Sequence, residues 1–242
     1  RITNWDAFDD KDDEDDAKVD QMVRIIQYLK TLPVKTVSID KVEADDIIAY
    51  LSKSVITHPK DKSFIISSDK DFLQLVSENV IVYRPMEKEY YTPKTVMDKY
   101  KMSPHNFILH KTLLGDNSDK IKGVKGLGEK GLLKKFPELI EKDMDWDDIL
   151  DICENKMSDH AVYARIIHGQ DDLEKNYKIM DLSNPMLSKE DKEWLNEVVS
   201  SKELPYHPDQ FIAMYNEDQI GGLIRNVEFW VKDCFENLVI KK

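Results

Sequence analysis

The sequence of 242 residues lacks long apolar runs, a secretory leader and all but two cysteines. No stretch approaches the roughly 20 apolar residues that span a bilayer. The opening residues, RITNWDAFDD, are polar and acidic, unlike a signal peptide. Cys153 and Cys234 are far apart and fit no metal-binding spacing. We therefore expect a protein of a reducing compartment, the cytoplasm, with no membrane partner.

The sequence also lacks an excess of basic residues. It has 35 lysines and arginines against 47 aspartates and glutamates, which gives a formal net charge of −12 at pH 7. A protein that coats nucleic acid over its whole surface is normally basic. The charge excludes such coating, but it leaves room for a local basic patch or for an acidic site that works through metal ions.

Acidic residues are concentrated near the start of the chain. Residues 6–20 hold nine acids and two lysines, a composition typical of a solvated or disordered segment. We expect residues 1–18 to be acidic and flexible. From Val19 onward apolar residues recur at helical spacing, and Pro33 ends this predicted helix.

Strand-like and helix-like segments alternate in the next part of the chain. The pattern predicts strands at 36–40, 63–67 and 79–85, and helices at 43–55 and 71–76. Such alternation indicates an α/β fold with a parallel sheet and helices on both faces. In such sheets the functional crevice lies at the carboxyl ends of the strands.

Near residue 103 the pattern changes to short helices with glycines between them. We place a domain boundary there. Residues 1–102 are expected to belong to the α/β domain, and residues 103–242 to a mostly helical C-terminal domain. The segments EDKEWLNEVV and GGLIRNVEFWVKDCFENLV in the second part are predicted to be amphipathic helices.

Three clusters of acidic residues stand out, each after an apolar segment. They are Glu43, Asp45 and Asp46; Asp69 and Asp71; and Asp116 and Asp119. Each cluster alone has an ordinary explanation, as helix first-turn charges, as turn and cap residues, or as a loop with a helix cap. Carboxylates from separate segments are also what magnesium needs, and two ions about 4 Å apart can assist a phosphodiester displacement. The conjunction of the three clusters favours a metal site.

A glycine-lysine loop follows the third cluster. The sequence GVKGLG at residues 123–128 has three glycines. From Asp116 to Lys135 the sequence contains six lysines and only three acidic residues. Glycine permits positive φ angles and a close approach of the backbone to a ligand. The amides that open the next helix, from about Glu129, would then face an anion. This predicts a helix-hairpin-helix at about 116–137 that grips DNA phosphates; the alternative is a plain turn with solvated lysines.

The segments VEADDIIAYL, IISSDKDFLQL and LLGDNSDKIKGVKGLGEKG, in this order and spacing, resemble the structure-specific 5′ nuclease superfamily of flap endonucleases and 5′-3′ exonucleases. Within it they are most similar to the ribonucleases H of T-even-type phages. The resemblance covers about residues 18–140. It implies a PIN-like (resolvase-like) α/β domain followed by a helical domain with a helix–three-turn–helix motif. It also implies a hydrolase that removes RNA primers and adjacent DNA in replication, in the host cytoplasm if phage-encoded.

The resemblance also implies a set of site residues. Two magnesium ions, for which manganese can substitute, would be bound by Glu43, Asp45, Asp69 and Asp71, with Asp116 and Asp119 on the more distant ion. Asp46 would assist through water, which makes the catalytic set Glu43, Asp45, Asp46, Asp69 and Asp71. A potassium ion would lie on backbone carbonyls of the loop. The expected DNA-binding residues are Lys122, Gly123, Val124, Lys125, Gly126, Leu127, Gly128 and Lys130.

One departure from the superfamily concerns the start of the chain. The superfamily begins with a buried strand that ends in an aspartate, followed by a second metal-binding aspartate and a basic helical arch. None of these is recognisable in the sequence. We expect the native protein to extend upstream and the chain as given to lack part of the first metal site.

Two other functions remain open from the sequence. One is a non-catalytic, structure-specific DNA-binding module, and the other is an RNA-directed nuclease of the PIN type, which the loop disfavours. The expected partners are DNA and RNA–DNA duplexes with 5′ ends or flaps, with a single-stranded-DNA-binding protein or sliding clamp as further candidates, and a monomer is expected. Phe229, Trp230 and Phe235 are candidates for docking such a protein, although their helical spacing favours core packing. Lys70 either offsets charge in the site or is solvated.

Overall fold

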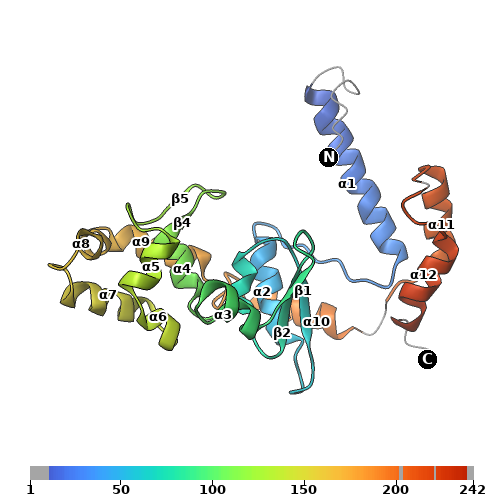
Figure 1. The fold of residues 1–242 in the computed structure, drawn as a ribbon. Coiled ribbons are helices and arrows are strands. Elements are labelled where there is room, and N and C mark those ends of the chain that lie inside the picture. Colours follow the sequence, from blue (N-terminus) through green and yellow to red (C-terminus); the bar gives the residue numbers. More distant parts are fainter. Residues whose placement is uncertain (1–10, 202–203, 221, 239–242) are drawn as a thin grey trace. The chain divides into compact units, whose positions relative to one another are not determined.

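The structure, a computed structural model, describes residues 11–201, 204–220 and 222–238 (Figure 1). The chain divides into two compact units, Arg1–Ser38 with Glu193–Lys242, and Ile39–Lys192. The sequence-based boundary near residue 103 lies inside the second unit, where one apolar core gives way to another. No helix of the described ranges is both long and apolar enough to cross a membrane.

The first unit is helical. Its elements are α1 (Lys11–Thr31), most of α10 (Lys189–Ser200), α11 (Pro208–Glu217), α12 (Val227–Phe235) and the short 3₁₀ helix η3 (Glu236–Leu238). Its core is formed by Leu32, Phe211, Tyr215 and Val231. Trp230 and Phe235 pack at the edge of this core, as their helical spacing predicted, whereas the Phe229 side chain is 65% exposed.

The helix that Pro33 was predicted to end is confirmed, but α1 begins earlier than the apolar pattern suggested. Residues 11–20 are helical and mostly exposed, so this part of the acidic segment is a solvated helix rather than an irregular segment. The acids in its first turn stabilise the helix, because they lie at the positive, amino end of the helix dipole. Lys18 also forms an ion pair with Glu14, one turn away, at 2.8 Å. Residues 1–10 lie outside the described residues.

The second unit contains a three-stranded sheet. Strands β1 (Ser63–Ile66) and β2 (Val80–Arg84) are parallel, and β3 (Glu89–Tyr91) is antiparallel to β2. The strands predicted at 63–67 and 79–85 are confirmed. The prediction of a strand at 36–40 is wrong, because this segment is extended or turned and pairs with no strand among the described residues. β3 was not predicted, because three residues are too few to show an alternating pattern.

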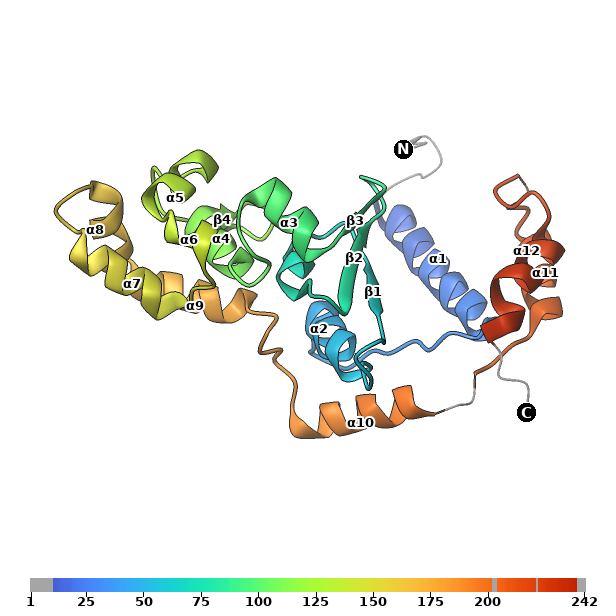
Figure 2. The same cartoon turned by 60° about the horizontal axis from the view of Figure 1, so that its bottom comes forward.

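Helices cover one face of this sheet within the second unit. Helix α2 (Ala44–Ser54) packs against β1 (Figure 2), and the 3₁₀ helix η2 (Asp71–Leu75) lies in the crossover from β1 to β2. The covered face carries buried side chains such as Ile65 and Val82. On the other face Phe64 and Tyr90 are exposed. Covering helices were expected on both faces, but the β2–β3 connection is a hairpin and supplies none for the exposed face.

The remainder of the second unit is a helical layer with its own core. Its elements are α3 (Pro93–Tyr100), α4 (Phe107–Leu114), the two-stranded hairpin of β4 (Gly115–Asp116) and β5 (Ile121–Lys122), α5 (Glu129–Lys135), α6 (Glu138–Glu141), α7 (Trp146–Asn155), α8 (Ala161–His168) and α9 (Gln170–Met180). Leu109, Leu113, Leu132 and Ile149 are fully buried in this core. Helix α4 is apolar on most of its circumference and therefore lies at the centre of the layer.

Candidate metal centre and DNA-binding loop

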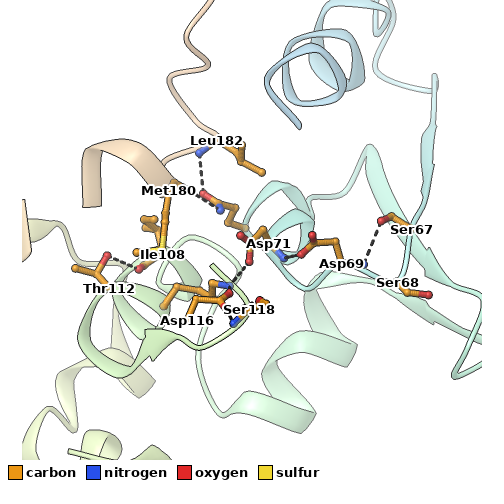
Figure 3. A network of polar contacts seen from close by, with 12 residues as sticks. Ser67, Ser68, Asp69, Asp71, Ile108, Thr112, Asp116, Ser118, Met180 and Leu182 are labelled. Carbon is orange, nitrogen blue, oxygen red and sulfur yellow. Dashed lines mark hydrogen bonds and ion pairs between the residues drawn. The ribbon is translucent and has the colours of Figure 1, made fainter. Parts of the chain in front are cut away.

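Asp69 and Asp71 follow β1, at the carboxyl end of the parallel pair. The Asp71 N–H donates to Asp69 Oδ1 at 2.9 Å, and the Asp69 N–H donates to Ser67 Oγ at 3.1 Å (Figure 3). Arg84, buried at the end of β2, donates to the Ser68 carbonyl at 2.7 Å. The turn that carries both aspartates is therefore held by its own side chains and by the neighbouring strand.

Helix η2 is anchored to the end of α9. Gln74 Nε2 donates to the Met180 carbonyl at 3.0 Å, and its Oε1 accepts from the Leu182 N–H at 3.0 Å (Figure 3). Phe72 and Leu73 on the same short helix are almost fully buried. The position of Asp71, between the sheet and the helical layer, is therefore fixed by the packing and hydrogen bonds of η2.

Asp116 and Asp119 lie in the hairpin of β4 and β5. Asp116 Oδ1 accepts from the Ser118 N–H at 2.7 Å and from the Ser118 hydroxyl. The hairpin approaches α4 so closely that a Cβ on Gly123 would meet the Leu114 carbonyl carbon at 2.1 Å. Gly123 is therefore required by contact with the chain's own backbone, whereas the sequence suggested approach to a ligand.

The structure brings Asp71, Asp116 and Asp119 together. Carboxylate oxygens of the three residues all lie within 4.8 Å of one another. Asp71 and Asp116 are partly buried and Asp119 is exposed, so the cluster has an open side. Three hard oxygen donors from two distant segments match the ligand preference of magnesium or manganese. Asp71, which the resemblance placed on the other ion, is thus grouped with the third acidic cluster.

Lys111, on α4, contacts this cluster from within. Its side chain is 11% exposed, and its ammonium forms ion pairs with Asp71 and Asp116. The hydrogen bond from Lys111, followed by those from Ser118, holds the pKa of Asp116 far below its usual range. Burial raises the pKa of Asp71, and Lys111 opposes that rise. Burial would lower the pKa of Lys111, but its bonds to Asp116 and Asp71 raise it, so the ammonium is charged at neutral pH.

The acids of the first helix lie outside the 4.8 Å cluster. Glu43 is the exposed N-cap of α2. Burial, and then the charges of Asp69 and Asp71, raise the pKa of the half-buried Asp45. Asp46 accepts the Met186 N–H at 2.9 Å, so its carboxylate holds the segment after α9. The carboxyl group of Asp45 is therefore close enough to Asp69 and Asp71 to be influenced by their negative charges. The catalytic role of Asp46 remains a prediction.

The glycine-lysine loop has a buried side and an exposed side. Val124 and Leu127 are 7% and 8% exposed and anchor the loop in the helical core. Lys122, Lys125 and Lys130 are exposed, so their ammonium groups are accessible to an anion such as a phosphate. Lys70, beside the acids, is also exposed.

One cavity adjoins both the acids and the loop. Its volume is about 680 Å³, and the residues that line it include Asp69, Asp116, Leu127 and Gly128. His110 also lines it, stacked on Phe107 with ring centroids 5.2 Å apart. A strand held by the loop would therefore pass close to the acids.

Sequence reasoning did not identify Lys111, Gln74 or Arg84. The signal for Lys111 was a single charged residue in the mostly apolar helix FILHKTLL, five residues before Asp116. A charged residue in such a position is buried only with a partner. Gln74 and Arg84 carried no recognisable signal, because the contacts that fix the aspartate-bearing turn are made to backbone groups of distant segments, the Met180 carbonyl and the Leu182 N–H for Gln74 and the Ser68 carbonyl for Arg84.

Comparisons with known proteins agree with this architecture. Residues 10–101 match the family described as 5′-3′ exonuclease, N-terminal resolvase-like domain. The chain is 33% identical over 177 residues to a 5′-3′ exonuclease of Aquifex aeolicus, covering 71% of this chain and 57% of that relative. It is 38% identical over 96 residues to the flap endonuclease Xni of Colwellia psychrerythraea, covering 40% of this chain and 33% of that relative.

The fold is also found among solved structures. The T5 D15 protein, co-crystallized with metal ions, has a TM-score of 0.57 and 20% identity, covering 89% of this chain and 74% of that one. The catalytic core of Rad2 in complex with DNA substrate has a TM-score of 0.52 and 16% identity, covering 91% and 70%. The chain spans about half the length of the curated relatives it matches. Residues 10–101 are thus similar to the resolvase-like domain of the 5′-3′ exonucleases, and the chain as a whole is similar to nucleases of this kind over part of their length.

Proposed function

We propose that this chain acts as a divalent-metal-dependent 5′ nuclease that hydrolyses phosphodiesters at 5′ ends and flaps of DNA and RNA–DNA duplexes. The observation that carries the proposal is the cluster of Asp71, Asp116 and Asp119 within 4.8 Å, beside a loop with exposed lysines. The relatives supply the reaction class, since they are named 5′-3′ exonuclease and flap endonuclease. Primer removal in replication, in the cytoplasm, is the role that fits this activity.

The metal ions would be held by two groups of acids. Asp71, Asp116 and Asp119 offer one site, and Glu43, Asp45 and Asp69 contribute to a second. When bound, magnesium or manganese supplies an activated water and stabilises charge on the phosphate oxygens. The T5 D15 protein has been co-crystallized with metal ions, which supports a metal requirement.

The protein's own side chains prepare this centre. Arg84 and Gln74 fix the segment from Ser68 to Asp71, so the carboxylates converge before any ligand arrives. Lys111 offsets the repulsion between Asp71 and Asp116. Burial and neighbouring acids raise the pKa of Asp45, and a nearby cation would reverse this effect and favour its charged form.

The DNA backbone would be held by the loop. Lys122, Lys125 and Lys130 supply positive charge to phosphates, while the chain's net charge of −12 keeps other surfaces from binding nucleic acid. The potassium ion expected at the loop remains a prediction. Two loop carbonyls, those of Val124 and Lys125, already accept hydrogen bonds from Leu127 and Arg165.

The test uses a 5′-flap DNA and an RNA-primed duplex, each with and without magnesium. We expect magnesium-dependent cleavage by the intact protein. Asp71→Asn should abolish cleavage and keep binding, because it removes a ligand charge without removing the loop. Asp98→Asn, an exposed acid on α3, is the matched control and should cleave normally. Binding without any magnesium-dependent cleavage in the intact wild-type protein would instead identify a non-catalytic DNA-binding module.

A further inference from the structure

The tip of the glycine-lysine loop is a tight turn whose central peptide has no partner within the turn. Residues Val124 to Leu127 form a four-residue turn, closed by the Leu127 N–H donating to the Val124 carbonyl at 3.0 Å. Gly126, in the third position, has a φ of +81°, the value that a type II turn requires there. The closing bond uses neither the Lys125 carbonyl nor the Gly126 N–H.

Arg165, on α8, supplies a partner for this peptide. Its Nη1 donates to the Lys125 carbonyl at 2.8 Å, and the same nitrogen lies 3.1 Å from the place of a Cβ on Gly126. Asn176, on α9, makes a longer contact of 3.4 Å to the Lys122 carbonyl. Arg165 and Asn176 line a cavity of about 460 Å³ together with the loop. The loop is therefore braced by side chains from the two helices that follow it.

The bond to Arg165 decides where the other end of the peptide points. The carbonyl and the N–H of a trans peptide point in opposite directions. Because the Lys125 carbonyl is directed to Arg165, the Gly126 N–H is directed away from it. In the described part of the chain no backbone acceptor pairs with this N–H. In a type I turn the same peptide would be rotated by about 180°. The hydrogen bond from Arg165 therefore stabilises the type II orientation over the type I orientation.

We propose that Arg165 is a positioning residue that fixes the Lys125–Gly126 peptide and thereby presents the Gly126 N–H to a DNA phosphate. The inference rests on the proposed function, since it takes the loop as the DNA-binding surface. The exposed Lys122 and Lys125 supply charge, and the preset N–H supplies a directed hydrogen bond to the phosphate. Arg165 acts through the loop and does not touch the DNA.

The test compares Arg165→Met and Arg165→Lys in the full chain with the wild type. Arg225→Met is the matched control, because it removes an exposed arginine of the other unit and changes the net charge equally. Affinity for a duplex with a 5′ flap is measured in EDTA at several salt concentrations. The thermal midpoint and the ¹H–¹⁵N resonance of Gly126 are recorded for the free proteins.

We expect Arg165→Met to weaken binding about fivefold, the net contribution of one hydrogen bond. The thermal midpoint and the salt slope should stay those of the wild type, while the Gly126 resonance moves. Arg165→Lys keeps one donor and should recover most of the affinity. Arg225→Met should bind as the wild type does.

Wild-type affinity in Arg165→Met would overturn the inference. So would a salt slope reduced by about one with an unmoved Gly126 resonance, since that is the signature of Arg165 contacting a phosphate directly. A wild-type protein that binds no flap DNA would overturn the proposed function itself, and so the two failures are distinguishable.

Discussion

Lys111 gives the candidate metal centre an internal cation. The ammonium lies against Asp71 and Asp116, on a side chain that is only 11% exposed. Without a divalent ion it offsets the repulsion of the carboxylates. A divalent ion would use the same oxygens and would take over part of that task. The stability of the protein and its affinity for metal are therefore linked through this one side chain.

Replacing Lys111 by Met should make the protein depend more strongly on metal. In EDTA we expect the free energy of unfolding to fall by about 3 kcal/mol, because a buried ion pair loses one partner. Magnesium should restore a larger part of the stability than it adds to the wild type. Urea unfolding with EDTA and with magnesium measures both effects.

The matched control for this lysine is Lys178→Met. It breaks an exposed pair with Glu174 on α9, which is worth at most about 1 kcal/mol. Equal magnesium stabilisation of Lys111→Met and wild type would show that Lys111 does not share the metal's position.

His110 predicts a pH dependence of stability. Burial lowers its pKa to about 4, so the folded state holds it neutral while the unfolded state takes up a proton below about pH 6.5. The contribution of the neutral His110 to the free energy of unfolding is complete above that pH and is lost as the pH falls towards 4. Between pH 7 and pH 5 this loss amounts to about 2 kcal/mol. His110→Phe should remove it, whereas exposed His105→Phe should not. Urea unfolding at both pH values decides, and equal losses in wild type and His110→Phe would contradict the prediction.

At the scale of elements, the hairpin of β4 and β5 determines whether the acids meet. Gly123 allows the hairpin's backbone to lie directly on the end of α4, where a Cβ would come 2.1 Å from the Leu114 carbonyl carbon. Gly115 allows the two strands of the hairpin to approach, where a Cβ would come 2.3 Å from the Gly123 nitrogen. The hairpin carries Asp116 and leads straight into the loop. A displacement of this short element would separate Asp116 from Asp71 and would also shift the loop that we propose binds DNA.

Gly123→Ala should therefore destabilise the protein and weaken metal binding together. The added Cβ would lie 2.1 Å from the Leu114 carbonyl carbon, so backbone must move. Gly128→Ala is the matched control, because nothing lies within 4 Å of its Cβ position and its φ of −121° suits any residue. Magnesium titration by calorimetry and thermal unfolding compare the two variants. Comparable losses in both would mean that the contact with α4 is not what positions Asp116.

The sequence predicted those elements whose residues carry their own pattern. The apolar run at 63–67 became β1 and the periodic segment at 43–55 became α2, since both patterns are local. The segment 36–40 also contains apolar residues, but no strand of the described part of the chain pairs with it, and such pairing depends on the whole fold. For the same reason the acidic pair after β1 could be recognised, while Lys111 as its partner could not.

At the scale of the molecule, the chain has two units with separate cores. The core of the first unit is formed by Leu32, Phe211 and Val231. The second unit, Ile39–Lys192, contains the acidic cluster, the glycine-lysine loop and the two larger hydrophobic cores. The first unit is closed by Arg24, which donates to Asp218 at 2.8 Å and to Glu217 at 2.7 Å. Everything that the proposed function needs within this chain therefore depends on the stability of the second unit.

This separation predicts two transitions in calorimetric unfolding of the full chain. Magnesium should raise the midpoint of one transition, that of residues 39–192, because a ligand stabilises only the unit that binds it. Arg24→Met should lower the other midpoint, since the bonds that join α1 to α11 are lost. Asp71→Asn should remove the magnesium shift and leave the Arg24-sensitive transition in place. A single transition that responds to both changes would contradict the prediction, because it would mean that the two cores unfold as one.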